Sequence, residues 1–484
     1  MALPPWLIWT LTVPGWVATV AVGILPGLYI LGVRTLPFTG WPLTAEMVVV
    51  AVFICRNWRS VVQCWSYFFW YKYCQAIELA DPDDNIDNID NRNKLSANDV
   101  SVVMPTVDPD EPWFQESLAS VCANAPARIF VVTVGDALHK VAEEAVLAYR
   151  NSSPAAGAGV DIRVSHTAVA NKRAQISSAI DDIETDFTFF VDSTALWPAR
   201  HLPAALAPFA EDPRIGLVGT EKLPKRLASD SYWARSWNFL GAAYLMRHNY
   251  EIAASSAIDG GVFIISGRSC GIRTSILKDP EFRRGYEDER ILIPGFIRCI
   301  ARVFGVHLAA EIGPLVADDD NYIKRWCEEH DIRTKFQCNM CLRWSRTTFR
   351  SNPRTLLSGR EWRNHPWSMY GVQLATITNF ALFFDPLLVY FYVQTSWFQG
   401  SSGERGWLGL AALVAWILLS KTVKLIPLFR RHPGDIIFLP AYWIFAYYHS
   451  WIKLRALLTF WDVEWAGRDL DKINRLAQKG DRSE

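Results

Sequence analysis

DFTFFVD, residues 186–192, is a short apolar run that ends in a carboxylate. Two similar runs precede it, VSVVMPTV at 100–107 and RIFVVTV at 128–134, and helix-compatible residues follow each of them. Short buried strands that alternate with helices predict a parallel α/β sheet. Ligands of such sheets bind at the carboxyl ends of the strands. This rule selects three candidate site residues: Asp108, Asp136 and Asp192.

Hydrophobic segments on the N-terminal side of this pattern indicate a membrane. Residues 5–33 carry no charge over more than the ~20 residues that cross a bilayer, and they lack the basic start of a signal peptide. A second span begins at 42–55 and is expected to extend further. The basic and aromatic residues of 56–74 are typical of a helix at the membrane–water interface, and they favour the cytoplasmic side.

Three more hydrophobic blocks follow the α/β pattern, at 368–396, 406–423 and 435–454. Basic residues after the second block favour a cytoplasmic end there, so the loop at 399–406 is expected outside. Two spans before the domain and three after it would send the C-terminal tail outside. The third block contains Pro440 and continues as a basic, aromatic segment, so it could instead be re-entrant or interfacial. We expect a cytoplasmic tail.

The chain therefore divides into five predicted parts. These are 1–78 with two transmembrane helices and an interfacial helix, a polar linker at 79–99, the α/β domain at 100–350, interfacial and transmembrane helices at 351–462, and a polar tail at 463–484. The linker is rich in Asp and Asn, but it lacks the central Gly and closing Glu of an EF-hand calcium loop.

Charge and cysteine content narrow the class of protein. Lys+Arg and Asp+Glu are equal at 49 each, and this net charge of zero gives no argument for a nucleic-acid partner, so none is expected. The nine cysteines are scattered and partly inside apolar segments, unlike a disulfide framework. We infer a reducing compartment around the soluble part.

Several polar residues of the α/β domain could carry chemistry. Asp192 could hold a divalent metal on a diphosphate, or could simply cap the next helix. Lys172 and Arg173, in the run NKR, stand at a helix start that suits phosphate, although a solvated basic pair is the simpler interpretation. DGGVFIISGRSCGIRTSIL (259–277) predicts an apolar strand that runs into Gly267 and then a helix start. The glycine permits close approach of a ligand or only a turn.

QCNMCLRWSRTTFR (337–350) places Arg343 and Trp344 shortly before the hydrophobic segments return. Arg can bind phosphate and Trp can stack on a sugar or base, while an interfacial anchor is the structural alternative. The CxxC pair Cys338 and Cys341 has no second ligand pair nearby, so neither a zinc site nor a redox site is expected.

The motifs VVMPTVD, NKR, VDST, ISGRSCGIRTSIL, ADDD and RW, in this order between membrane segments, resemble one family. It is the membrane-embedded family-2 glycosyltransferases, which include hyaluronan, chitin and cellulose synthases. Within this family the chain is similar to the fungal type-2 glycosyltransferases linked to hyphal growth and to cell-wall or capsule-like polysaccharides. The resemblance implies a GT-A-like, Rossmann-like α/β domain that binds a nucleotide sugar, cytoplasmic and inserted between transmembrane and interfacial helices.

The resemblance also implies roles for individual residues. Those of the nucleotide pocket are Thr106, Asp108 and Asp136, with Lys172 and Arg173 near the uracil and diphosphate. Asp192 would hold Mg²⁺ or Mn²⁺ on the diphosphate. Arg343 would bind the leaving diphosphate and Trp344 would stack near the acceptor sugar. Gly267 corresponds to the acceptor-side floor.

Two positions depart from the family pattern. The DxD motif reads Asp192-Ser193-Thr194, so its second carboxylate is absent. The QxxRW motif begins with Met340 in place of Gln. Sugar transfer is therefore better supported than processive synthesis.

VADDDNYIKRW, residues 316–326, runs three aspartates into a helix-like stretch. Neighbours on a helix point about 100° apart, so the three carboxylates cannot all face one site. The resemblance to the family's GDD pattern implies that Asp320 is the general base and Asp319 a supporting acid near the acceptor. Asp318 is then a helix cap or solvated surface.

We therefore expect an inverting hexosyltransferase, in which an acceptor hydroxyl loses a proton as it attacks the anomeric carbon. By the resemblance it would sit in the plasma membrane and use a UDP-sugar to elongate a cell-surface or extracellular polysaccharide. Its partners would be the growing glycan acceptor and the lipid bilayer, with the product extruded through its own helices. The alternatives are transfer of a single sugar to a lipid acceptor, or an inactive membrane scaffold, which the altered DxD and QxxRW motifs keep open.

Overall fold

The computed structural model describes most of the chain. The described residues are 3–36, 39–79, 95–152, 159–226, 228–229, 231–263, 265–293, 295–303, 307, 309–315, 319–339, 352–400 and 403–459. They form two compact units. One comprises the described residues of 1–72, 222–263 and 342–460, and the other comprises those of 73–221 and 264–341. We call them the helical unit and the α/β unit and describe each separately.

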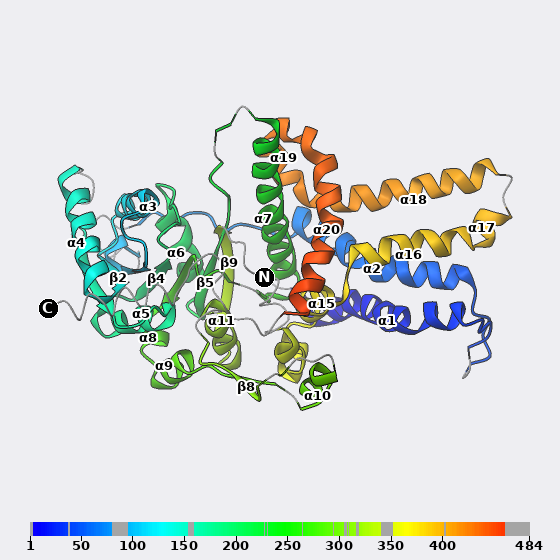
Figure 1. The fold of residues 1–484 in the computed structure, drawn as a ribbon, viewed down its shortest axis with the longest axis horizontal. Coiled ribbons are helices and arrows are strands. Elements are labelled where there is room, and N and C mark those ends of the chain that lie inside the picture. Colours follow the sequence, from blue (N-terminus) through cyan, green and yellow to red (C-terminus); the bar gives the residue numbers. More distant parts are fainter. Residues whose placement is uncertain are drawn as a thin grey trace. The chain divides into compact units, whose positions relative to one another are not determined.

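A seven-stranded sheet forms the centre of the α/β unit (Figure 1). Its strands are β1 (Val100–Pro105), β2 (Arg128–Val134), β3 (Asp161–Thr167), β4 (Phe187–Val191), β5 (Ile215–Glu221), β6 (Ser269–Arg273) and β9 (Arg333–Asn339). Their spatial order is β3-β2-β1-β4-β6-β5-β9. Strands β3, β2, β1 and β4 pair in parallel, β6 is antiparallel to both its neighbours, and β5 pairs in parallel with β9.

The three predicted strands are β1, β2 and β4, and their parallel pairing confirms the α/β prediction. The sheet as a whole is mixed because β6 reverses direction. Strands β3, β5, β6 and β9 were not predicted from the sequence. The strand expected to run into Gly267 is wrong, because β6 begins after that glycine. β3 lies at an edge and has several exposed side chains, so DIRVSHT shows no apolar run. SCGIR of β6 is buried, but it is short and only weakly apolar.

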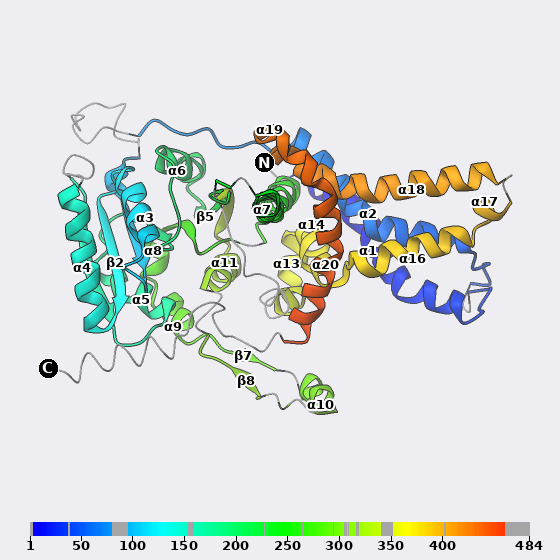
Figure 2. The same cartoon turned by 45° about the horizontal axis from the view of Figure 1, so that its top comes forward.

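Helices pack on the sheet through one main core. The helices of this unit are α3 (Pro112–Cys122), α4 (Gly135–Ser152), α5 (Lys172–Ala179), α6 (His201–Glu211), α8 (Thr274–Leu277), α9 (Pro280–Glu287), α10 (Gly295–Val303) and α11 (Asp319–Glu329), with short helices η1 (Ala97–Asp99) and η2 (Ile180–Asp182). The small strands β7 (Ile291–Leu292) and β8 (Glu311–Ile312) pair with each other. Alternate residues of β1, β2 and β4 share this core with α3, α4 and α6, and Figure 2 shows α4 beside β2.

The helical unit contains the hydrophobic segments. Its elements are α1 (Pro5–Ile30), α2 (Ala45–Phe69), α7 (Tyr232–Asp259), α13 (Gly359–Asn364), α14 (Pro366–Ser368), the π-helical turn η3 (Met369–Leu374), α15 (Ala375–Thr378), α16 (Ala381–Val393), α17 (Ser396–Gln399), α18 (Glu404–Thr422), η4 (Val423–Leu425), α19 (Ile426–Arg431), η5 (Pro433–Phe438) and α20 (Leu439–Leu457). Within this unit α2 packs against α1, α7 and α16, and α16 contacts α18 and α20.

Three helical segments of the described chain are long and apolar enough to cross a membrane: Pro5–Ile30, Ala45–Phe69 and Glu404–Arg431. A fourth candidate is the pair Pro366–Thr378 and Ala381–Val393, which is bent by 88° and is either one broken span or a re-entrant loop. Helix α2 runs unbroken through the second predicted span and most of the predicted interfacial segment. Most of the predicted linker (80–94) and the whole tail (463–484) lie outside the described residues.

Candidate active site

The three strand-end aspartates lie at the same edge of the sheet. Asp108 follows β1, Asp136 lies in the first turn of α4 directly after β2, and Asp192 follows β4. Strand β1 lies between β2 and β4 and pairs in parallel with both, so the carboxyl ends of the three strands meet at this edge. The edge that the sequence predicts as the ligand side therefore carries all three carboxylates.

The Lys172 ammonium contacts three other groups at this edge of the sheet. Its Nζ lies 3.0 Å from Asp192 Oδ1 and 3.1 Å from Asp319 Oδ2, and it donates to the Gly267 carbonyl at 3.0 Å. The contact with Gly267 is a hydrogen bond, and the contacts with the two carboxylates are ion pairs. Lys172 is only 6% exposed. The side chain therefore joins α5, β4, α11 and the turn before β6 at one point.

Gly267 is required by this close packing. A Cβ at position 267 would lie 2.9 Å from Lys172 Nζ and 3.0 Å from Asp319 Oδ2. Its backbone N–H donates to Asp320 Oδ2 at 3.1 Å, while its carbonyl accepts from Lys172. The glycine thus contacts Lys172 and Asp320, and it leaves no space for a side chain beside Asp319.

Asp319 and Asp320 open helix α11 and have different surroundings. Asp319 is 7% exposed and is held by Lys172, whereas Asp320 is only half-buried. Asp320 Oδ1 accepts from the backbone N–H of Asn321 at 2.9 Å. The N-terminal end of a helix favours negatively charged side chains. Of the two carboxylates, Asp320 is the more exposed.

The remaining residues predicted for the nucleotide pocket lie on the first two strand ends. Thr106 is buried, and its Oγ1 accepts from the Asp108 N–H at 3.3 Å. Asp136 is about half-exposed, and its Oδ1 lies 3.1 Å from His166 Nε2. Gln175, which sequence reasoning missed, donates to the carbonyls of Thr106 and Val132 at 3.0 and 2.8 Å and so joins β1 to β2.

Arg173 faces into the protein. It is fully buried, donating to Glu289 Oε2 at 2.8 Å and to the Tyr286 carbonyl at 2.8 Å. Arg325 of α11 pairs with the other oxygen of the same Glu289. Glu289 therefore joins α5 to α11 and supports the helix that carries Asp319 and Asp320. Arg325 lies in the stretch 316–326, but no residue pattern in the sequence indicated that it pairs with Glu289, so the three-residue ion-pair group was not predicted.

Asp318, Arg343 and Trp344 lie outside the described residues, so their predicted roles stay predictions. A further cation near Asp192 was not singled out from the sequence. Arg268 Nε lies 3.6 Å from Asp192 Oδ2, and the Arg268 side chain is 29% exposed. Its position directly after Gly267 in ISGRSC was the available signal.

Comparison with known proteins decides the family. Residues 97–363 match the family described as glycosyltransferase like family 2. The chain is a family-2 glycosyltransferase. A type 2 glycosyltransferase of Pyricularia oryzae is 34% identical over 92% of this chain and 90% of its own length. One of Gibberella zeae is 33% identical over 80% of this chain and 72% of its own. A solved mannosyltransferase of Pyrobaculum calidifontis, in complex with GDP-Man and Mn²⁺, covers 83% of this chain and 98% of its own at 16% identity and a TM-score of 0.41.

This assignment confirms the predicted transferase class and the GT-A-like fold of the α/β unit. The positive charge of Lys172 lies close to the negative charges of three carboxylates. Burial by itself lowers the pKa of the Lys172 ammonium, but the nearby carboxylates of Asp192, Asp319 and Asp320 outweigh burial and raise that pKa above its ordinary value of 10.5. Lys172 is therefore a permanent cation throughout the physiological range.

The side chains at this site could bind a divalent metal only together with a diphosphate, which would supply further oxygen ligands. Among the described residues no group of three or more His, Cys, Asp or Glu side chains could hold a metal alone. Asp192 gives one oxygen to Lys172 and keeps 17% of its side chain exposed. Mg²⁺ is commonly bound by one or two carboxylates together with substrate phosphates and water. A single accessible carboxylate meets this minimum.

Proposed function

We propose that this glycosyltransferase transfers a sugar from a UDP-sugar to a growing polysaccharide with inversion at the anomeric carbon. The observation that carries the proposal is the convergence of Asp192, Lys172, Gly267 and Asp320 at the carboxyl edge of the sheet. One carboxylate there is accessible to a diphosphate and another to an acceptor. Inverting transfer needs this pair of functions at one edge.

Asp320 acts as the general base. As the acceptor oxygen attacks the anomeric carbon, its proton passes to Asp320, the new glycosidic bond forms, and the bond to the UDP oxygen breaks. Asp320 is half-buried and is oriented by the N–H groups of Gly267 and Asn321. Asp319 does not take the proton. It holds Lys172, which fixes the start of α11 relative to Asp192.

Asp192 would hold Mg²⁺ or Mn²⁺ together with the donor's diphosphate, and the metal would offset the charge of the leaving UDP. Arg268 lies beside Asp192 and is partly exposed, so it can add a second positive charge for the same diphosphate. Thr106, Asp108 and Asp136 would contact the nucleoside from the first two strand ends. These assignments leave Lys172 as an organiser of the site.

We further propose that the enzyme is a multi-pass protein of the plasma membrane with a cytoplasmic catalytic domain. Candidate spans come both before and after the family-2 region, with Pro5–Ile30 and Ala45–Phe69 on one side and Glu404–Arg431 on the other. Helices on both sides of the domain suit an enzyme that exports its polymer through its own spans. The acceptor would then be the growing chain.

The proposal is tested by incubating membranes that contain the protein with radiolabelled UDP-GlcNAc, UDP-GlcA or UDP-Glc, with Mg²⁺ or Mn²⁺, and sizing the product. GDP-mannose serves as a comparison donor, because its nucleotide carries guanine in place of uracil. Long polymer from a UDP-sugar supports the proposal. A chloroform-soluble product would show transfer to a lipid, and turnover of GDP-mannose alone would refute the UDP donor.

Membranes with Asp320→Asn serve as the matched blank, because the substitution removes the base and keeps the shape of the side chain. Asp331→Asn is its control, since Asp331 is exposed and lies just beyond the end of α11. Absence of turnover with every donor in the wild-type membranes, under conditions in which the protein is folded, would favour an inactive scaffold.

A further inference from the structure

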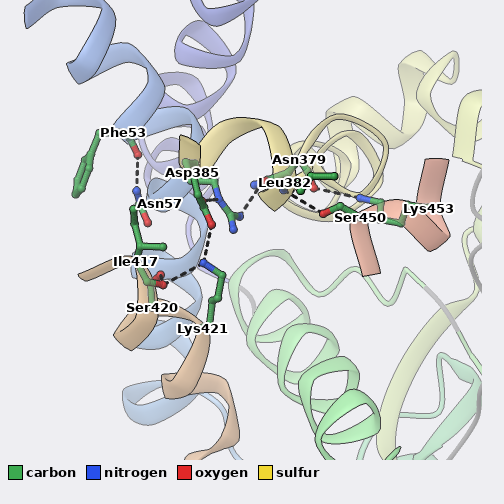
Figure 3. Close-up of polar contacts among 11 residues, drawn as sticks. Phe53, Asn57, Asn379, Leu382, Asp385, Ile417, Ser420, Lys421, Ser450 and Lys453 are labelled. Atoms are coloured by element: carbon green, nitrogen blue, oxygen red, sulfur yellow. Dashed lines mark hydrogen bonds and ion pairs between the residues drawn. The ribbon is translucent and has the colours of Figure 1, made fainter. Parts of the chain in front are cut away.

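A chain of polar side chains crosses the helical unit between four helices (Figure 3). Lys421 of α18 donates to Asp385 Oδ2 of α16 at 2.6 Å, and Arg56 of α2 donates to Asp385 Oδ1 at 2.7 Å. Arg56 also donates to Asn379 Oδ1 at 2.8 Å, and Lys453 of α20 donates to the Asn379 carbonyl at 3.2 Å. We call these five residues the basic cluster.

The charges of the basic cluster do not balance. Arg56 and Lys421 share the carboxylate of Asp385. Lys453 donates to the Asn379 carbonyl and, among the described residues, forms no ion pair. Lys421 and Lys453 are only 8% and 7% exposed. Burial without a counter-charge disfavours the charged form of an ammonium, so an anion bound beside Lys453 would stabilise its charge.

The adjacent charged group supplies no spare carboxylate. Glu251 Oε1 accepts from Lys424 at 2.6 Å and lies 3.7 Å from a nitrogen of Arg59. There too one carboxylate serves two cations. The excess of positive charge therefore extends over both groups and cannot be relieved by a local change of partners.

The depth of the basic cluster matches a lipid headgroup. Lys421 comes 17 residues after Glu404 in one helix, which at about 1.5 Å per residue is roughly 26 Å, close to the ~30 Å thickness of the hydrocarbon core. If Glu404 lies at one surface of the membrane, Lys421 lies near the other. Basic pockets between transmembrane helices at that depth are where anionic lipid headgroups bind.

The break between α15 and α16 lies within the basic cluster. The two helices of the bent pair meet at Asn379 and Phe380 at 88°, so the amino end of α16 starts within the cluster. Helix amino ends attract anions. Arg56 keeps 15% of its side chain exposed, and Asn379 is half-buried, which leaves a route to solvent or lipid.

We propose that the basic cluster binds the phosphate headgroup of an anionic membrane lipid, which neutralises Arg56, Lys421 and Lys453 and holds α2, α16, α18 and α20 together. The inference does not depend on the proposed sugar transfer. It requires only that α2 and α18 cross a membrane. Failure of lipid binding and failure of transfer are therefore separate results.

The test uses the full chain purified in a neutral detergent. Native mass spectrometry measures retention of phosphatidic acid in competition with phosphatidylcholine. We expect the wild type to prefer phosphatidic acid, and Lys453→Met to weaken that preference about fivefold, as expected for loss of one cation at a membrane surface. Arg405→Met is the matched control, because Arg405 is exposed near the opposite end of α18. It should leave the preference unchanged.

Thermal unfolding without lipid separates a ligand site from a structural clamp. Lys453 has no carboxylate to abandon, so Lys453→Met should unfold no earlier than the wild type in lipid-free detergent, and should lose the rise in midpoint that phosphatidic acid gives the wild type. Lys421→Met provides a second folded variant, because Asp385 keeps Arg56 as a partner.

The proposal is overturned if the wild type shows no preference for phosphatidic acid, or if neither variant changes the preference. Inorganic phosphate at millimolar concentration distinguishes the source of the anion. If it displaces phosphatidic acid completely, the cluster is a free-phosphate site and the lipid assignment is wrong. Persistence of bound phosphatidic acid in that competition supports the lipid.

Discussion

Lys172 Nζ lies 3.1 Å from Asp319 Oδ2, so the first residue of α5 and the first residue of α11 meet in one buried ion pair. The two residues are far apart in the sequence, and neither contact partner is exposed by more than 7%. This pair distinguishes the two adjacent aspartates of α11, because Asp319 contacts Lys172. We propose that Asp319 holds the helix in place and that Asp320 serves the acceptor.

Asp320→Asn should reduce sugar transfer to the background of the assay while the protein stays folded. The amide keeps the size of the side chain but cannot take the acceptor's proton. Loss of a general base typically costs about 10²- to 10⁴-fold in rate. Radiolabel incorporation measures transfer, and size-exclusion chromatography checks folding. A comparable loss in Asp331→Asn would mean that the effect is not specific to the proposed base.

Lys172→Met should destabilise the α/β unit, because it leaves Asp192 and Asp319 facing each other without their cation. Removal of one partner from a buried charge network typically costs about 3–5 kcal/mol in the free energy of unfolding. Denaturant unfolding of the purified chain measures it. Lys278→Met removes an exposed lysine of the same unit and should cost little.

The stability that Lys172→Met is expected to lose should depend on pH in a defined direction. The pKa of Lys172 is raised in the folded state above its ordinary value of 10.5, so its contribution is fully present below about that pH and is lost as pH rises through the folded pKa. The stability difference between wild type and Lys172→Met should therefore stay constant from neutral pH to mildly alkaline pH. Shrinkage of the difference in that window would contradict the assignment of Lys172 as a permanent cation.

Gly267→Ala should impair catalysis more than folding. The added methyl group would lie 2.9 Å from Lys172 Nζ and 3.0 Å from Asp319 Oδ2, so one of these groups must move. A displacement of about 1 Å at a reacting centre can cost on the order of 100-fold in rate. Gly159→Ala is the control in the same unit, because a Cβ there meets no atom within 4 Å. Full activity of Gly267→Ala would show that the close packing is not required.

Metal binding should depend on the nucleotide. Asp192 is a single accessible carboxylate, so Mn²⁺ should bind weakly to the protein alone and much more tightly when UDP is present. Electron paramagnetic resonance of free Mn²⁺ during titration measures this coupling. Asp192→Asn should abolish it, whereas Asp186→Asn, at the exposed opposite end of β4, should not. Equal Mn²⁺ affinity with and without UDP would refute a shared site.

The sequon Asn151-Ser152-Ser153 should remain unglycosylated in a eukaryotic host, because the catalytic domain is proposed to be cytoplasmic. Gln399→Asn creates Asn-Gly-Ser in the loop expected outside, and that variant should gain a glycan. A shift in gel mobility that glycosidase reverses reports each site. A glycan at Asn151 would reverse the proposed orientation.

Local patterns predicted much of the architecture. The apolar runs of β1, β2 and β4 are buried strands because their side chains face helices on the sheet, and that burial is visible as hydrophobicity in sequence. Strand β3 was missed because an edge strand is only half-covered, so exposed polar residues interrupt its pattern. The uncharged length of residues 5–30 similarly predicted one candidate span directly.

The family, the strand-end carboxylates and the acidic pair at the start of α11 can be predicted from the sequence, because each depends on residues that are close together in the chain. The pairing of the charges is visible only in the folded structure. There Lys172 and Arg173, neighbours in sequence, turn to different partners, with Lys172 at the carboxylates of the site and Arg173 on buried Glu289. Ion pairs form between segments far apart in sequence, and the direction of a side chain at a helix start depends on what packs against it. No local pattern carries that information.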